Sequence, residues 1–191
     1  MARPKSEEKR TKLLAVATEV FAKNGLSAST ASISNAAGMA EGTLFIYFKG
    51  KDELINAVYQ EIKQDLGEAL LSGYPQKGSI RSRIKHIWNR YIDWGIESPD
   101  KVAALHKIKV WEGLRPDVRD AMMARFAEIH SLCDSAIKEG KFQKIPHEFV
   151  MAMLSAQAET SMQFMRQNPT RADFYKDKGF EIFWNGITNK G

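Results

Sequence analysis

The chain has 191 residues, of which 43% are hydrophobic and 27% charged, with one cysteine and a formal net charge of +5. This length and apolar fraction support one compact unit or two small ones, and the lone Cys133 excludes an internal disulfide and a cysteine-cluster zinc site. The longest apolar run, Phe149 to Leu154, is too short for a membrane span, and the N-terminus lacks the apolar core of a signal peptide, so we expect a cytoplasmic protein without membrane contacts.

The positive charge is concentrated near the N-terminus. Residues 1–51 contain eight Lys and Arg against four Glu, a net charge of +4, whereas residues 52–191 carry a net charge of only +1. A basic segment on a nearly neutral body indicates an anionic partner for that segment, although a solvated basic tail would have the same charge.

The first predicted elements are a helix and then two short helices joined by a turn. An apolar stripe at helical spacing ends at Asn24-Gly25, which is typical of a left-handed helix end; its members are Leu13, Leu14, Ala17, Val20 and Phe21. Ser29 and Thr30 can cap a short helix that runs to Ala37, and Gly38 then permits the positive φ of a tight turn. A second short helix follows from about Glu41 to Phe48.

Two short helices joined by a glycine-containing turn form the helix-turn-helix arrangement, whose second helix enters the major groove of DNA. We expect Ile33, Leu44 and Phe48 to be buried against the first helix, around Leu14 and Phe21.

Helical periodicity continues through the rest of the chain. Stripes are predicted from Leu54 to Leu70, from Ile84 to Tyr91 and, as one continuous helix, from Val118 to Ile137. Ser98-Pro99 and a capping box from Thr170 to Asp173 indicate further helix starts. No alternating strand pattern of useful length occurs, so we predict an all-α fold of about nine helices.

Residues 7–55 resemble the N-terminal region of the TetR-type bacterial transcriptional repressors. The positions that agree with the family pattern, in register, are Phe21, Gly25, Ala28, Thr30, Ile33, Ala37, Gly38, Gly42, Thr43, Leu44, Tyr47, Phe48, Lys51 and Leu54. The resemblance implies a three-helix DNA-binding domain at residues 1–50 and a helical effector-binding and dimerisation domain at residues 51–191.

The resemblance also implies which residues contact double-stranded DNA. Thr30 matches a phosphate contact at the start of the second helix, Tyr47 matches a phosphate-contacting aromatic, and Lys51 opens the fourth helix beside a phosphate. Arg3 and Lys5 belong to an N-terminal arm that could enter the minor groove. The remaining candidates lie on the second short helix of the motif, which we call the reading helix because it would enter the major groove: Glu41, Gly42, Thr43, Phe45 and Ile46.

Three residues depart from the family pattern. Ala40 replaces the usual Ser, so the reading helix loses a good N-cap, at a cost of about 1 kcal/mol. Phe45 replaces the usual Tyr and cannot donate to a phosphate. Glu41 stands where a basic or neutral residue is more common, and it either complements the helix dipole or accepts from a cytosine amino group; Ile46 could contact a thymine methyl or simply pack.

The C-terminal part is rich in Trp and Met, most of which suits a hydrophobic core. The resemblance adds an effector pocket, for which the lining candidates are Trp88, Tyr91, Trp111, Met122, Phe126 and His130. It also implies a homodimer through helices 146–167 and 171–188. The second of these helices ends in more apolar surface than a lone terminal helix normally exposes, at Phe180, Ile182, Phe183, Trp184 and Ile187, although burial within the monomer would account for part of it.

Catalytic and metal sites have little support. The candidate ligands are His86, His106, His130, His147 and Cys133; of these His130 and Cys133 share one helix face, but a buried Cys133 is the better interpretation because no second ligand pair is visible. We therefore expect that the protein binds no cofactor and is not an enzyme. The sequence favours a homodimeric transcriptional regulator, most simply a repressor, that binds a palindromic operator and a small, largely apolar effector. The alternative is an all-α small-molecule carrier or enzyme without sequence-specific DNA binding.

Overall fold

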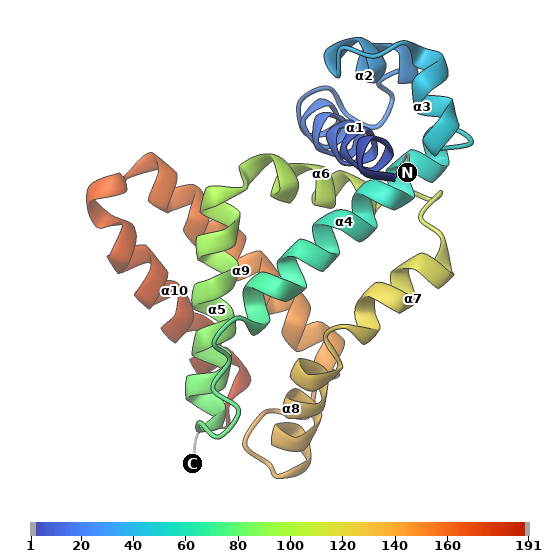
Figure 1. Cartoon of the computed structure of the whole chain (residues 1–191). Coiled ribbons are helices and arrows are strands. Elements are labelled where there is room, and N and C mark those ends of the chain that lie inside the picture. The colour runs from blue at the N-terminus through green and yellow to red at the C-terminus, as the bar shows by residue number, and fades with distance from the viewer. Residues whose placement is uncertain (1–2, 190–191) are drawn as a thin grey trace. The chain divides into compact units, whose positions relative to one another are not determined.

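The structure, a computed structural model, describes the backbone of residues 3–189 and the side chains from residue 7 on; within that range it is all-α, as predicted (Figure 1). It contains ten α-helices, and the single isolated β-bridge in this range pairs Phe142 with Thr188. The helices, with one short 3-10 turn, are α1 (Arg3–Asn24), α2 (Thr30–Ala36), α3 (Glu41–Tyr47), α4 (Lys51–Leu71), α5 (Ile80–Glu97), α6 (Pro99–Lys109), α7 (Pro116–Ala124), α8 (Ala127–Lys138), α9 (His147–Gln167), η1 (Pro169–Arg171) and α10 (Ala172–Ile187).

The helices group into two compact units. The first comprises residues up to Asp65 together with Ser98–Met122, and the second comprises Leu66–Glu97 together with the chain from Met123 on. This is a different division from the predicted one at residue 50, because the first unit also takes in most of α4, all of α6 and most of α7. The functional boundary at residue 50 stays a prediction.

The first unit is built around α1. Leu14, Phe21, Ile33, Leu44 and Phe48 are all buried, as the apolar spacing predicted. Helix α6 packs along α1. Lys107 on α6 donates from Nζ to the carbonyl oxygens of Phe21, at 3.1 Å, and Ala22, at 2.5 Å, and so satisfies acceptors in the last turn of α1.

The core of the second unit is formed by α5, α9 and α10, which pack against one another. The Trp88 ring of α5 is fully buried, lies 6.2 Å from the Phe183 ring in a stacked arrangement, and donates from Nε1 to the carbonyl oxygen of Lys176 at 2.9 Å. Helix α8 packs on α9. No helix within residues 3–189 combines the length and the apolar character that crossing a membrane requires.

Three local predictions are wrong. The stripe from Val118 to Ile137 is broken between α7 and α8, because Phe126 leaves helical geometry at φ −100° and ψ 12°; neither Arg125 nor Phe126 is a helix breaker, so the periodicity carried no sign of it. The Ser98 side chain makes no capping hydrogen bond, although Pro99 does begin α6. The segment around Thr170 forms the 3-10 turn η1 instead of a capping box, and α10 begins at Ala172.

Candidate nucleic-acid interface

The turn between α2 and α3 has the predicted glycine geometry. Gly38 adopts a φ of +67°, a left-handed conformation that side chains with a Cβ rarely take, and its N–H donates to the Asn35 carbonyl oxygen at 3.0 Å. Ser29 caps α2, with its hydroxyl accepting from the backbone N–H of Ser32 at 3.1 Å. Two short helices with a fixed turn form a helix-turn-helix unit.

Helix α3 has one buried and one exposed face. Leu44 is fully buried, and Phe48 just beyond the helix is 2% exposed, so this side is anchored in the first unit. Phe45 is 47% exposed and Ile46 is 77% exposed. Because side chains three and four positions apart share a helix face, Glu41, Gly42, Phe45 and Ile46 form one exposed surface, which we call the reading face. Thr43 and Tyr47 are half-buried beside it.

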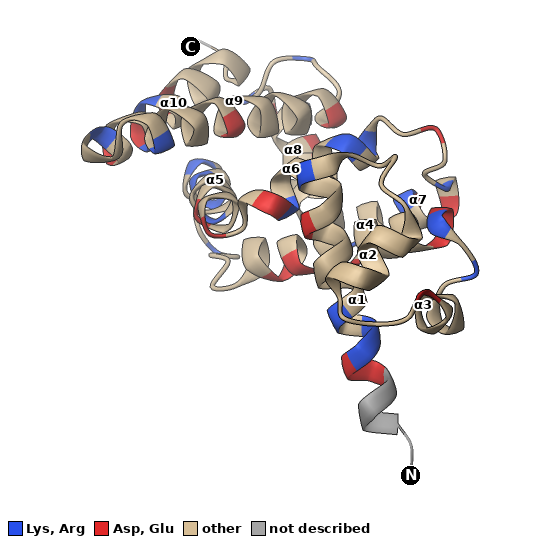
Figure 2. Cartoon of the chain, turned by 90° about the horizontal axis from the view of Figure 1, so that it is seen from above, with Lys and Arg blue, Asp and Glu red and all other residues tan. Residues whose placement is uncertain are grey.

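The reading face has a distinct charge pattern. Helix α2 carries no charged residue, and on α3 the sole charge is at Glu41, so both ribbons are tan in Figure 2 apart from the red start of α3. The Thr30 hydroxyl donates to Glu41 Oε1 at 2.6 Å, which joins the first residues of the two helices. Both residues are predicted DNA contacts, but their spacing in the sequence does not indicate this bond.

The start of α3 lacks a side-chain cap, as predicted. Ala40 occupies the N-cap position with extended backbone and makes no capping hydrogen bond. By contrast, a side-chain hydrogen bond is present at the start of α4, because Glu53 accepts from the backbone N–H of Lys49, just before the helix, at 2.8 Å. Lys51, the first residue of α4, is half-buried. The side chains of Arg3 and Lys5 lie outside the described residues.

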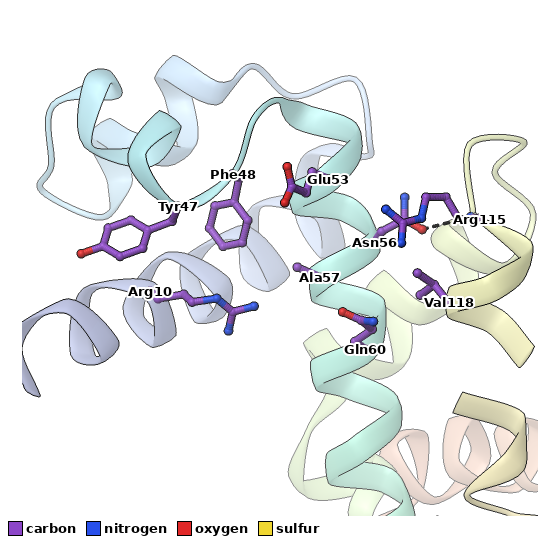
Figure 3. Close-up of a pocket in the computed structure, with 9 residues that line it drawn as sticks. All are labelled: Arg10, Tyr47, Phe48, Glu53, Asn56, Ala57, Gln60, Arg115 and Val118. Atoms are coloured by element: carbon purple, nitrogen blue, oxygen red, sulfur yellow. Dashed lines mark hydrogen bonds between the residues drawn. The ribbon is translucent and has the colours of Figure 1, made fainter. Parts of the chain in front are cut away.

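Arg10 is a cationic residue that the motif did not single out. Its guanidinium carbon lies 5.5 Å from the centre of the Phe48 ring, a cation–π arrangement that holds the charge beside α3. Arg10 also lines a pocket with a volume of about 150 Å³, whose lining side chains are drawn in Figure 3. It is lined by Arg10, Tyr47, Phe48, Glu53, Asn56, Ala57, Gln60, Arg115 and Val118. Sequence analysis counted the Arg10 charge, but the packing partner at Phe48 lies 38 residues away and left no local signal.

The predicted effector-lining residues are divided between the two units. Trp111 and Met122 belong to the first unit, and the other four belong to the second. Tyr91 is 4% exposed and donates from its hydroxyl to Glu159 on α9 at 2.9 Å. Burial and the Glu159 carboxylate raise the pKa of Tyr91 well above its usual value. Tyr91 and Trp88 on α5 are thus held by α9 and α10, and their role in effector binding stays a prediction.

Two further effector candidates lie in the second unit, together with His86, which the sequence suggested only as a metal ligand or catalytic residue. Phe126 is 4% exposed and lies against Gly67, whose Cβ, if present, would be 3.8 Å from the ring. His130 is half-buried and stacks on His147, with ring centres 4.9 Å apart. His86 Nε2 is buried without a hydrogen-bond partner, and an unsatisfied buried nitrogen marks a place for a polar ligand atom or a water.

Helices α9 and α10 occupy the positions predicted for dimerisation and lie side by side (Figure 1). Their exposed apolar residues are Phe149, Phe164, Phe174 and Ile182. Phe164, Phe174 and Ile182 border a groove of about 240 Å³ between the two helices. By contrast, Phe180, Phe183 and Ile187 are buried within the second unit, so the alternative of burial within the monomer holds for these three residues, whereas Ile182 is exposed.

Two of the candidate metal ligands, Cys133 and His147, have ordinary surroundings. Cys133 is fully buried, and burial raises the pKa of its thiol to about 12. His147 Nδ1 lies 2.7 Å from Asp134 Oδ1. Among the side chains that the structure describes, no group of three or more His, Cys, Asp or Glu is arranged to hold a metal ion.

Comparison with known proteins agrees with this geometry. The sequence profile of the bacterial regulatory proteins of the tetR family matches residues 13–58, which contain most of α1, all of α2 and α3 and the start of α4. Residues 13–58 therefore have the sequence of a tetR-family N-terminal domain. A tetR family transcription regulator from Shewanella sp. PV-4 superposes with a TM-score of 0.85 over 95% of this chain and 99% of that one; at 24% identity this likeness shows the fold.

Two curated proteins that are similar to part of this chain are regulators. The chain is 27% identical over 89 residues to the fatty acid metabolism regulator protein of Bacillus subtilis (strain 168), covering 44% of this chain and 46% of that protein. It is 30% identical over 81 residues to the HTH-type transcriptional repressor KstR2 of Rhodococcus jostii (strain RHA1), covering 40% of each. The chain therefore matches less than half the length of these two relatives.

Proposed function

We propose that this protein is a cytoplasmic, sequence-specific DNA-binding transcriptional regulator that acts as a homodimeric repressor on a palindromic operator. The observation that carries the proposal is the reading face of α3, which is exposed while Leu44 anchors the helix from behind. In helix-turn-helix proteins the N-terminal residues of the second helix contact base edges, and here those residues are Glu41, Gly42 and Thr43. None of these observations favours a carrier or an enzyme.

The backbone contacts are assigned to the residues around this face. Tyr47 and Lys51 are the proposed phosphate contacts on either side of the end of α3, and Arg10 adds a cation beside Phe48. Phosphate contacts fix the position of a protein on the duplex, whereas base contacts select the sequence. The net charge of +4 in residues 1–51, doubled in a dimer, supports strong electrostatic attraction to the duplex.

The salt dependence of DNA binding tests the Lys51 contact. Lys51→Ala is expected to weaken binding to every DNA sequence and to lower the slope of log K against log salt by about one unit per lost contact. Fluorescence anisotropy with labelled duplexes at several salt concentrations measures both quantities. Lys138→Ala, which removes an exposed lysine of α8, serves as the matched control and should leave the slope unchanged. An unaltered slope in Lys51→Ala contradicts the contact.

We further propose that a small, largely apolar effector binds in the second unit and releases the DNA. Since one similar protein is a fatty acid metabolism regulator, long-chain apolar metabolites are the class to test first. Release requires that the effector bind the DNA-incompetent state better, by about 5.5 kcal/mol for a shift from 1:99 to 99:1. His86, with its unsatisfied Nε2, is the polar group proposed to orient the ligand.

Tryptophan fluorescence tests the effector proposal. A long-chain acyl compound is expected to change the emission of Trp88 and Trp94, which are buried on α5, and to lower DNA affinity over the same concentration range. His86→Phe, which keeps an aromatic ring and removes the polar nitrogens, should lower the affinity for the ligand while leaving the affinity for DNA unchanged. Release of DNA by hydrophilic anions alone would rule out an apolar effector.

A further inference from the structure

The hydrogen bond between Thr30 and Glu41 has the geometry of a charge-assisted contact. Its length of 2.6 Å between Oγ1 and Oε1 falls in the range of about 2.5–2.7 Å that is typical of a hydroxyl donating to a carboxylate. The bond spans the turn, since eleven positions separate the two residues. It therefore holds a carboxylate in a defined orientation at the start of the reading helix.

This bond limits what the Thr30 hydroxyl can do. A threonine hydroxyl has one proton to donate. While that proton is donated to Glu41 Oε1, the hydroxyl cannot also donate to a DNA phosphate. The structure thus favours a positioning role for Thr30 toward Glu41 over the phosphate contact that the family pattern implies.

A carboxylate on the reading face also limits which DNA sequences this face can bind. Glu41 is the single acidic residue between Lys23 and Lys51, and it is exposed. Phosphates repel it, so a favourable contact has to come from a hydrogen-bond donor on a base edge. In the major groove the donors are the amino groups of cytosine and adenine, and the adenine amino group lies next to the N7 acceptor, which repels a carboxylate. Cytosine N4 is therefore the best partner.

We propose that Glu41 accepts a hydrogen bond from the N4 amino group of a cytosine in each operator half-site, and that Thr30 is the positioning residue that orients its carboxylate. Oε1 is occupied by Thr30, which leaves Oε2 for the base. The inference rests on the proposed function as a DNA-binding regulator and adds a specific base to it.

The test is selection of binding sites from a library of random DNA duplexes, performed with the full-length protein and its variants. The wild type should enrich a palindrome with a cytosine preferred at one position of each half-site by about 5- to 150-fold. Glu41→Ala should lose the preference at that position alone. Glu41→Gln should shift it toward adenine, because an amide pairs with the adenine N6 and N7 edge.

Variants of Thr30 separate positioning from phosphate contact. Thr30→Val keeps the shape and removes the hydroxyl, and it should weaken the cytosine preference several-fold while leaving the salt slope unchanged; Thr30→Ser should restore the preference. Ser32→Ala is the matched control on the same helix, because the Ser32 hydroxyl donates to the Ser29 carbonyl oxygen at 2.7 Å within α2. Circular dichroism confirms that each variant is folded.

Each result decides the matter. An unchanged sequence preference in Glu41→Ala overturns the base contact. A uniform loss of affinity with a reduced salt slope in Thr30→Val assigns Thr30 to a phosphate and overturns its positioning role. If the wild type enriches no sequence at all, the proposed function itself fails, and this outcome differs from a palindrome that is enriched without dependence on Glu41.

Discussion

Ile182→Asp is expected to produce a monomer and to reduce operator affinity by about 100- to 10,000-fold. Ile182 is 56% exposed on α10 and borders the groove with Phe164 and Phe174. A charge in the middle of an apolar dimer contact loses its water without gaining a partner. In a dimer, binding of one DNA-binding domain holds the other at a high effective concentration near its half-site. A monomer loses this advantage, which accounts for a loss of this size. Sedimentation velocity at micromolar concentration and DNA anisotropy measure the two effects.

The control for this prediction is Val110→Asp. Val110 is also an exposed aliphatic residue, at 83%, but it lies at the end of α6, outside α9 and α10. It should leave the sedimentation coefficient and the operator affinity unchanged. A wild-type chain that sediments as a monomer, or an Ile182→Asp variant that remains a dimer, rules out α9 and α10 as the dimer interface.

Gly179→Val is expected to lower the free energy of unfolding by about 3 kcal/mol, because the site has no room for a side chain. A Cβ at Gly179 would lie 2.2 Å from Ser161 Oγ and 2.9 Å from Trp88 Cζ2. Ser161 is held by its own bond to the Gln157 carbonyl oxygen, and the Trp88 ring is fully buried, so neither neighbour moves away at low cost. In a chain of this size the melting temperature should fall by roughly 6–12 °C, measured by circular dichroism.

Gly186→Val is the matched change on the same helix. A Cβ at Gly186 would meet nothing within 4 Å among the described residues, so this variant should stay within about 1 kcal/mol of the wild type. Equal melting temperatures for the two valine variants would show that α10 does not pack against Trp88 as closely as the structure describes.

The helix-turn-helix was predictable from sequence because its determinants are local. Gly38 supplies the positive φ, Ser29 caps α2, and Leu44 recurs at the spacing that buries one side of α3. The missing cap at Ala40 could be predicted for the same reason, since capping depends on a residue and its neighbours a few positions away.

The features that could not be predicted depend on which parts of the chain meet in space. An apolar stripe does not reveal whether its partner is the same chain or a second copy, and Phe183 proved to stack on Trp88, 95 positions earlier. The bond from Thr30 to Glu41 and the position of Arg10 over Phe48 depend on side-chain directions that spacing does not encode. The predicted effector residues were chosen by composition, which does not distinguish a pocket from the filled core around Trp88.

The most direct test of sequence-specific regulation is a competition measurement with the purified full-length chain. A labelled duplex from the region upstream of its own coding sequence is bound at physiological salt, and unlabelled random-sequence DNA is then added. We expect the upstream duplex to be bound about 1,000-fold or more tightly than random DNA, as is typical of specific regulators on their sites. Equal competition by random DNA would mean that the basic N-terminal segment binds DNA without sequence preference, and it would contradict the proposed function.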